Sequence, residues 1–277
     1  MKFRKCRWLT GLLLAVLGLW GCTDGAKTTH SSEPVQSVRM RVLSFNMHHG
    51  RGGDDRINLE RIAGVILDSG ADLVALQEVD VKTQRSGGID QLAELKRLTG
   101  MAGVFGKGRD FEGGDYGQAI LSRFPIKSSE VHHLQGSLPG DVDLRIALSA
   151  QIDGPLTGTV TQFVTTHLHH QVEAHRMVQA TRLMQIFNAQ ATSSSLIVAG
   201  DFNAEPEATV IALLNTRFQD STPPDALTYP TDKPVKKLDY IFASQTGPWK
   251  LLESRVIPEM AASDHRPVVA DFEVFSR

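Results

Sequence analysis

Two short polar segments carry the side chains that metal and phosphate chemistry needs. Gly200-Asp201-Phe202-Asn203 follows the apolar run 195–199, and Ser263-Asp264-His265 lies further along the chain. Carboxylate oxygens are the ligands that hard divalent cations prefer. Carboxamide and imidazole groups donate hydrogen bonds to phosphoryl oxygens. Together, the two segments indicate a site that handles a metal ion and a phosphate.

Polar residues also stand at the end of, or within, five other apolar runs. Strand ends suit active sites, because the sheet fixes the backbone while the loop beyond it opens to solvent. The polar residues at these five places are Asn46, Gln77 with Glu78, Arg145, His167 and Asp239.

Glu78 and Asp264 are candidate ligands of a hard cation. Alone, Glu78 is typical of a solvated carboxylate, because glutamate is seldom buried unpaired. It comes directly after a largely apolar run and beside Gln77, and this position favours metal binding. Mg²⁺ keeps several waters, so one or two carboxylates and a substrate phosphate suffice as its other ligands.

Asn46, Asp201 and Asn203 each have a structural and a chemical interpretation. The asparagines suit turns, and Asp201 suits the cap of a helix near Pro206. In a phosphoester site, a carboxamide would instead donate to a phosphoryl oxygen, and a carboxylate would orient or deprotonate a water nucleophile. The residues by themselves leave both interpretations open.

His167 belongs to a histidine-rich stretch that also holds His169, His170 and His175. Such a cluster raises the question of zinc. The stretch has neither a cysteine nor the helical His-Glu-x-x-His spacing, and this disfavours a zinc site.

His265 is best interpreted as the partner of Asp239. The carboxylate would hold the imidazole in one tautomer, so that the other ring nitrogen meets the substrate. Arg145 is either a strand-surface charge or a phosphate ligand, because its planar guanidinium suits bidentate phosphate binding.

The N-terminal residues are expected to direct export. Four basic residues precede the apolar stretch 8–20, which is shorter than the roughly 20 residues of a membrane span. Leu19-Trp20-Gly21-Cys22 is similar to a bacterial lipobox, although tryptophan replaces the usual small residue. We expect a lipoprotein-type signal peptide over 1–21, lipidation of Cys22 and a flexible tether over 22–37. A simple secreted form is the alternative.

Charge and cysteine content restrict the function of the mature chain. Removing 1–21 takes away four basic and no acidic residues, which lowers the formal net charge from −2 to −6. An acidic chain without a basic run is at a disadvantage in binding nucleic acid. Cys6 lies in the leader, so Cys22 would have no disulfide partner. The region 38–277 is long enough for one sizeable α/β domain.

Hydrophobic periodicity predicts more strands than helices. Helical spacing occurs at 57–67, 91–98 and 173–189, and strand patterns occur at 39–45, 72–76, 119–122, 126–134, 144–152, 159–166, 195–199, 238–242, 249–256 and 268–272. Several strands follow one another directly, so a strict βαβ repeat fails. An α/β fold of two packed mixed sheets flanked by helices fits better.

The order of these motifs resembles the endonuclease/exonuclease/phosphatase superfamily. That superfamily includes deoxyribonucleases, apurinic-site endonucleases, inositol-polyphosphate phosphatases and neutral sphingomyelinases. Seven ordered blocks carry the resemblance across nearly the whole mature domain: 44–46, 76–79, 117–126, 166–168, 200–203, 238–241 and 263–267. The resemblance implies a four-layer α/β/β/α sandwich of two mixed β-sheets, with the site at one edge of both sheets.

The resemblance also implies metal ligands and residues that act on the water. Glu78 would be the principal Mg²⁺ ligand, assisted by Asn46 and Asp264, and Mn²⁺ would be a substitute. Asp201 and Asn203 would position the attacking water and a phosphoryl oxygen.

The remaining implied roles concern the phosphate and the proton. His265, held by Asp239, would act as a base or transition-state donor. His167 and Arg145 would bind the phosphate, together with Asn203.

Three positions help to indicate which branch of the superfamily this chain resembles. The apurinic-site enzymes carry tyrosine where this chain has His167, so the deoxyribonuclease, phosphatase and sphingomyelinase branches fit better. Gln118 replaces an expected asparagine, which leaves its role open. The segment 85–91 looks like that of a small bacterial hydrolase group whose substrates are mostly unassigned.

These features predict an exported Mg²⁺-dependent phosphoesterase that acts by in-line attack of water. We expect a monomer, anchored in a bacterial cell-envelope membrane by its lipid, that acts on a small molecule or lipid head group. One alternative is an exported nuclease with a local basic patch of Lys107, Arg109, Lys236 and Lys237. The other is a lipoprotein that kept the fold but only binds a partner.

Overall fold

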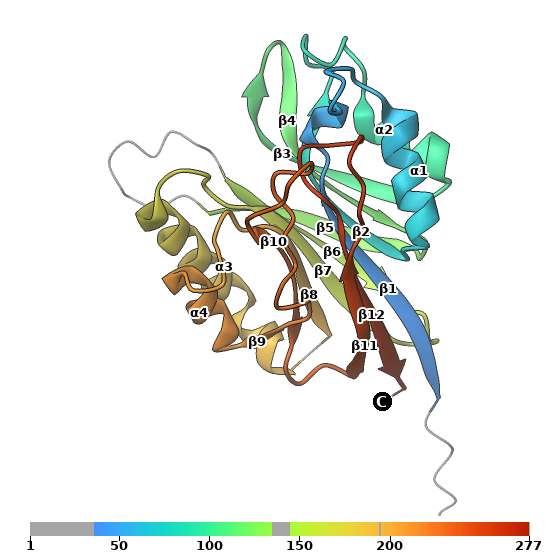
Figure 1. The fold of residues 1–277 in the computed structure, drawn as a ribbon. Helices are drawn as coiled ribbons and strands as arrows, with labels where there is room; N and C mark the ends of the chain where they lie inside the picture. Colours follow the sequence, from blue (N-terminus) through green and yellow to red (C-terminus); the bar gives the residue numbers. More distant parts are fainter. Residues whose placement is uncertain (1–35, 135–144, 194, 277) are drawn as a thin grey trace, which may run out of the picture. The chain divides into compact units, whose positions relative to one another are not determined.

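The computed structural model describes residues 36–134, 145–193 and 195–276 (Figure 1). The expected signal peptide, the lipidation of Cys22 and nearly all of the expected tether lie outside the described residues. The first strand begins at Ser37, the last residue of that tether. Within the described ranges, no helix is both long and apolar enough to cross a membrane.

Two six-stranded sheets form the centre of the domain. The first has the order β11 (Trp249–Val256), β12 (Val268–Phe275), β1 (Ser37–Asn46), β2 (Leu73–Val81), β4 (Gly114–Ser122) and β3 (Ala102–Phe111). The second has the order β5 (Ile126–His133), β6 (Ile146–Asp153), β7 (Val160–His167), β8 (Leu196–Asp201), β10 (Asp239–Ser244) and β9 (Phe218–Asp220). Both sheets are mixed, because β1 and β2 are parallel, as are β7 and β8, and the other neighbours are antiparallel.

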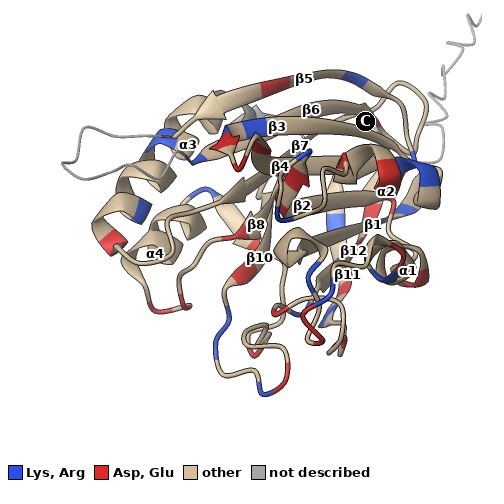
Figure 2. Ribbon diagram, turned by 90° about the horizontal axis from the view of Figure 1, so that it is seen from above, with Lys and Arg blue, Asp and Glu red and all other residues tan. Residues whose placement is uncertain are grey.

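Helices cover the outer face of each sheet. Figure 2 shows α1 (Leu59–Ser69) and α2 (Gln91–Thr99) on one side of the domain and α3 (Glu173–Ser193) and α4 (Thr209–Asn215) on the other. One apolar cluster lies under each helix pair and a third lies between the sheets. The four-layer α/β/β/α sandwich expected from the sequence is therefore confirmed.

The elements that periodicity missed are short or lie at an edge. β9 spans only three residues and α4 only seven, so neither repeats a pattern long enough to detect. β3 is an edge strand with glycine and charged residues, and most of its side chains stay partly exposed. Only tertiary contacts define these three elements.

The predicted helices α1 and α2 begin and end at residues with local signals. The side chain of Asn58 accepts a hydrogen bond from Arg61 N, and that of Asp90 accepts one from Ala93 N. Both helices end at a glycine with positive φ, Gly70 and Gly100. Such caps satisfy backbone groups that a helix end leaves open.

A buried carboxylate joins β12 to β1. Asp271 is fully buried and accepts hydrogen bonds from Arg41 Nε, at 2.7 Å, and from Arg39. Burial alone would raise the pKa of Asp271, but the two guanidinium groups outweigh it and lower that pKa to about 2. A lowered carboxyl pKa stabilises the folded state above the ordinary value of 3.8.

The Asp271→Asn variant should lose about 2 kcal/mol of unfolding free energy at neutral pH, because the partly buried Arg41 would lose its carboxylate partner. The difference in unfolding free energy between this variant and wild type should narrow as the pH falls from about 4 toward 2, where Asp271 of the wild type takes up a proton. Urea unfolding at several pH values checks this, with Asp110→Asn as an exposed control. Equal stability of Asp271→Asn and wild type at pH 7 would contradict it.

Candidate active site

Polar residues from both sheets meet at one edge of the domain. In the parallel pair β1 and β2, Asn46 lies opposite Gln77. In the parallel pair β7 and β8, His167 lies opposite Asp201, and Asp239 of β10 lies opposite Asp201 on its other side. Ligand sites in α/β proteins form at the carboxyl ends of parallel strands. Strand pairing thus brings these residues together.

Side-chain hydrogen bonds hold the two sheets and a loop together at this edge. Gln77 Nε2 donates to Thr165 Oγ1 at 2.9 Å, and Asn46 Nδ2 donates to Asp201 Oδ2 at 3.1 Å. Ser263 Oγ donates to the carbonyl oxygen of Asn46 at 2.7 Å and accepts from His265 N. The loop that carries Asp264 and His265 is therefore held directly at the end of β1.

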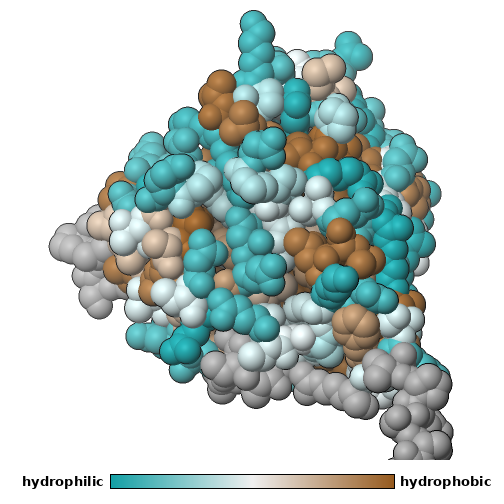
Figure 3. Space-filling view, turned by 60° about the horizontal axis from the view of Figure 1, so that its bottom comes forward, coloured by the Kyte–Doolittle hydropathy of each residue, from teal (hydrophilic) through white to brown (hydrophobic). Residues whose placement is uncertain are grey.

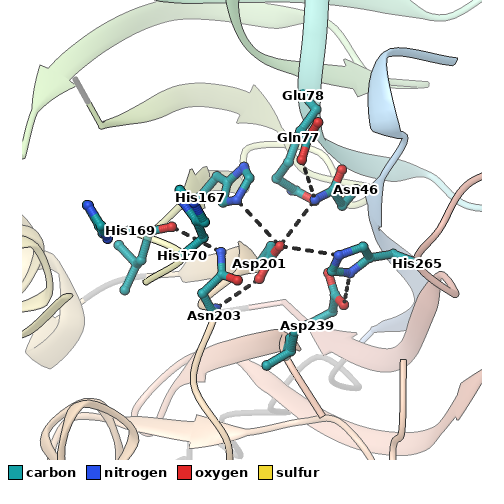
Figure 4. Close-up of polar contacts among 12 residues, drawn as sticks. Asn46, Gln77, Glu78, His167, His169, His170, Asp201, Asn203, Asp239 and His265 are labelled. Carbon is teal, nitrogen blue, oxygen red and sulfur yellow. Dashed lines mark hydrogen bonds and ion pairs between the residues drawn. The ribbon is translucent and has the colours of Figure 1, made fainter. Parts of the chain in front are cut away.

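Asp201 lies at the centre of this arrangement (Figure 4). Besides Asn46, the backbone N–H of Asn203 donates to Asp201 Oδ1 at 2.8 Å. The Nε2 atoms of His167 and His265 lie 3.5 and 3.7 Å from Asp201 Oδ2. Asp201 does not cap α4, whose N-cap Ala208 has no side-chain bond. The carboxylate is instead surrounded by groups that chemistry on a phosphate can use.

The two imidazoles beside Asp201 differ in protonation. Burial lowers the pKa of His265, but the carboxylates of Asp239 and Asp201 outweigh it and raise that pKa to about 10. Burial and the guanidinium of Arg145 lower the pKa of His167 well below its usual range. Burial raises the pKa of Asp201, against the opposing charge of His265. At neutral pH, His265 is a charged donor and His167 a neutral one.

His265 and Asp239 form the pair that the sequence indicated. His265 Nδ1 lies 2.8 Å from Asp239 Oδ2, and both residues are buried. The ring of Tyr229 packs on the imidazole, with centroids 4.9 Å apart. These contacts fix the ring and direct Nε2 toward Asp201.

Glu78 reaches the site through a local backbone distortion. The pairing of β2 with β4 shifts register around it, and Glu78 has a φ of 59°. His48, His49 and Asn203 also have positive φ, so four of the seven such non-glycine residues in the described ranges lie at this edge. Backbone strain of this kind is typical of functional sites.

The expected metal ligands provide a set of oxygen donors. Burial raises the pKa of Glu78, but the nearby imidazoles of His49 and His167 and the hydrogen bond from Asn46 outweigh it and lower that pKa well below its usual range. Glu78 is therefore an ionised carboxylate, and the half-exposed Asp264 faces the same cavity. This donor chemistry fits Mg²⁺.

Asn46 is oriented as a hydrogen-bond donor. Its Nδ2 lies 3.2 Å from Glu78 Oε1, and its Oδ1 accepts from His48 N. To serve as a metal ligand, Asn46 would have to turn its amide oxygen toward the ion. His49 Nδ1 lies 4.0 Å from Glu78 Oε2, and imidazole nitrogen beside carboxylate also suits transition metals such as Mn²⁺.

A cavity of about 410 Å³ opens at this edge. Seven of the expected residues line it: Glu78, Arg145, His167, Asp201, Asn203, Asp264 and His265. The other two, Asn46 and Asp239, are buried behind the lining and hydrogen-bond to it. All the expected site residues that the structure describes are thus brought together.

Arg145 and Asn203 are held by backbone carbonyl groups. Arg145 comes directly before β6 and is 7% exposed, and its Nη1 donates to the carbonyl oxygen of His167 at 3.4 Å. Asn203 Nδ2 donates to the carbonyl oxygen of Leu168 at 3.1 Å, and the second N–H of an amide can still donate to a ligand.

Gln118 makes a hydrogen bond beside Arg145. Its Nε2 donates to the carbonyl oxygen of Ile146 at 3.2 Å, the residue next to Arg145. Thr166 Oγ1 donates to the same oxygen at 3.0 Å. Gln118 therefore links β4 to the start of β6 beside the phosphate-binding candidate.

Several cavity residues had no assigned role in the sequence. Near the cavity, His48 and His49 come two and three residues after Asn46, so their position after a strand end is a usable signal. Tyr116 lies just before a recognisable motif block. Tyr229 comes from a loop, and no sequence pattern places it at the cavity. Arg109 of β3 was considered only for the basic patch of a nuclease.

Three comparisons with known proteins agree with this arrangement. A model of the Endonuclease/Exonuclease/phosphatase family matches residues 43–265. The uncharacterized protein YbhP of Escherichia coli K12 is 29% identical over 258 residues, which cover 87% of this chain and 99% of YbhP.

Solved structures share the fold at low sequence identity. An endonuclease/exonuclease/phosphatase from Bacteroides vulgatus has a TM-score of 0.70 and 21% identity, covering 86% of this chain and 99% of that one. The mannosyl-6-phosphatase Bt3783 of Bacteroides thetaiotaomicron has a TM-score of 0.70 and 17% identity, covering 84% and 99%. Because the family model spans well over half of the chain, this protein belongs to the endonuclease/exonuclease/phosphatase family, whose members are generally hydrolases, either phosphatases or nucleases.

Proposed function

We propose that this protein is an exported Mg²⁺-dependent phosphoesterase that cleaves a phosphodiester or phosphomonoester by in-line attack of water. The observation that carries the proposal is the carboxylate of Asp201, flanked by His167 and His265 on the wall of a cavity that also holds Glu78. A carboxylate between two imidazole donors can orient a water while the donors contact phosphoryl oxygens.

Each residue has a task that follows from its contacts. Asp201 orients the water and takes its proton, and Asn203 donates to a phosphoryl oxygen. His265, oriented by Asp239, donates to the oxygen on which charge develops, and His167 donates to another oxygen of the phosphate. Mg²⁺ held by Glu78 and Asp264, with Asn46 beside them, would neutralise charge on the phosphate when bound.

The distribution of basic residues favours a small substrate over nucleic acid. Lys237 is 3% exposed and pairs with Asp220 at 2.8 Å. Lys107 pairs with Asp110 and Asp115. Of the four basic residues considered for a nuclease patch, only Arg109 and Lys236 line the cavity. Positive charge inside a cavity suits a small ligand, whereas nucleic-acid binding draws on charge spread along a surface.

A lipid at Cys22 would hold the domain beside a membrane. The face shown in Figure 3 has hydrophobic residues in separate patches among hydrophilic ones. Among the described residues, the most exposed large hydrophobic side chains are Val235 and Met260. We propose a tethered enzyme of the bacterial envelope that meets a small molecule or a lipid head group.

A panel of phosphoesters assayed with Mg²⁺, Mn²⁺ or a chelator tests the proposal. We expect hydrolysis of at least one monoester or diester with Mg²⁺ and its loss with chelator, because Glu78 and Asp264 lie on the cavity wall. The Glu78→Gln variant should need at least about tenfold more Mg²⁺ for half-maximal rate, and Glu130→Gln is an exposed control on β5.

Each of the two alternative functions predicts a different result in the same phosphoester panel. Degradation of plasmid DNA with Mg²⁺, at a rate above that of the small esters, would favour the nuclease. No hydrolysis with any metal would favour the binding lipoprotein, although every expected catalytic residue is present.

A further inference from the structure

A short turn after β1 places two histidines beside the carboxylate of Glu78. The turn is the 3-10 helix η1 (His48–Gly50), which begins two residues after Asn46, and both of its histidines have a φ of 45°. Positive φ in two consecutive residues with a Cβ is costly, and it persists only where the surrounding structure holds the backbone.

Hydrogen bonds hold this turn in place. His48 N donates to Asn46 Oδ1 at 3.1 Å. Gln91 Nε2 donates to the carbonyl oxygen of His49 at 2.7 Å. The amide oxygen of Gln91 accepts from Asp80 N on β2 at 2.9 Å. The turn is therefore fixed between β1, β2 and the start of α2, which positions both imidazoles.

The two ring nitrogens that lie nearest to the carboxylates are buried. Nδ1 of His48 and Nδ1 of His49 have no hydrogen-bond partner among the described residues. They lie 3.6 Å from Asp264 Oδ1 and 4.0 Å from Glu78 Oε2, respectively, which is longer than a normal hydrogen bond. His49 is only 7% exposed, and a buried polar atom without a partner is costly. Two such nitrogens beside carboxylate oxygens indicate a cation that binds both kinds of group.

The geometry of this cluster is that of a possible metal site. The ligand atoms of His48, His49 and Glu78 all lie within 4.8 Å of one another. Zinc holds its ligands at about 2.0–2.2 Å, so two ligands of one tetrahedral ion lie about 3.3 Å apart. Small side-chain rotations would bring the three atoms around one ion. Two histidines and a glutamate form a zinc ligand set with an open fourth position, whereas Mg²⁺ takes oxygen ligands.

A second group of possible ligands lies at the same edge and consists of Asp201, Asp239 and His265. Nδ1 of His265 already lies 2.8 Å from Asp239. Asp201 accepts hydrogen bonds from Asn46 and from the backbone of Asn203. Because this group is already engaged internally, the turn with two histidines is the better nitrogen site.

We propose that His48, His49 and Glu78 bind one transition-metal ion of the Zn²⁺ class, in addition to the proposed Mg²⁺. The ion would use Oε2 of Glu78, which lies nearest to His49, whereas Oε1 accepts from Asn46. Imidazole nitrogen favours zinc and similar ions over Mg²⁺. The ion would give the two buried nitrogens a partner and fix the orientation of Glu78. The inference goes beyond the proposed hydrolysis and needs no substrate.

Calorimetric titration of the metal-free protein with Zn²⁺, in buffer with excess Mg²⁺, tests this site without turnover. We expect wild type to bind Zn²⁺ stoichiometrically. His48→Gln and His49→Gln should each weaken that binding at least about tenfold, since loss of even an outer partner of a metal ligand costs about 10- to 100-fold. His133→Gln, the same exchange at an exposed histidine of β5, is the matched control and should bind as wild type does.

Co²⁺ provides a second measurement, which a purely structural role of the histidines would not change. Four-coordinate Co²⁺ with nitrogen ligands absorbs visible light much more strongly than the hydrated ion. Wild type and His133→Gln should show this absorption band, and His49→Gln should lose it. Circular dichroism checks the fold of each variant.

Three results would overturn the inference. They are the absence of stoichiometric Zn²⁺ binding by wild type, unchanged binding by either His48→Gln or His49→Gln, and loss of binding in His265→Gln alone, which would place the ion at Asp201. The phosphoester panel can fail independently, because it measures hydrolysis and these titrations do not.

Discussion

Asp201→Asn should lower turnover about a thousandfold or more while the protein stays folded. Asparagine keeps the size and one acceptor oxygen, so one of the two hydrogen bonds, from Asn46 or from the backbone of Asn203, can remain. The substitution removes the negative charge that orients the water and faces His265. The rate constant on the best ester of the panel is the measurement.

Asp110→Asn is the matched control for this prediction. It makes the same chemical change on an exposed carboxylate that pairs with Lys107. The control should keep nearly the wild-type rate, and thermal unfolding should show that both variants remain folded. Full activity of Asp201→Asn would remove Asp201 from the mechanism.

His265→Gln should lower turnover by about 10²- to 10⁴-fold, because the charged donor beside Asp201 is lost. Glutamine is a better test than alanine, since its amide can still donate to Asp239 and avoid a buried, unpaired carboxylate. The effect should fall mainly on kcat, if His265 acts on charge that develops in the transition state.

His132→Gln is the control for the His265→Gln variant. It makes the same exchange on β5, where the imidazole contacts Ser149 and Phe187. A His265→Gln enzyme with wild-type kcat would show that this imidazole has no part in the chemical step.

Most strands could be located along the sequence, because buried strands give continuous apolar runs. The runs before Asn46, Gln77, His167 and Asp201 all match observed strands. Their polar ends therefore identified the candidate residues, and the ordered motif blocks identified the family. Short-range patterns suffice for such features because the side-chain period of a strand is local.

Long-range pairing decided the geometry. The opposition of His167 and Asp201 depends on the register of β7 with β8, and the contact of Asn46 with Asp201 depends on the packing of two sheets. No local pattern specifies either relation. The orientation of Asn46 as a donor to two carboxylates likewise emerges only when both carboxylates are near it.

The sequence by itself determined the apolar runs of the two sheets and the set of candidate residues, because both depend on local patterns along the chain. The resemblance carried by its ordered motifs indicated the family and the four-layer fold. Only the tertiary structure decided that Glu78 enters the site from a distorted strand, that the two imidazoles beside Asp201 differ in charge, and that Arg109 faces the cavity. Bulges and burial fix these features, and each depends on neighbours that are distant in sequence.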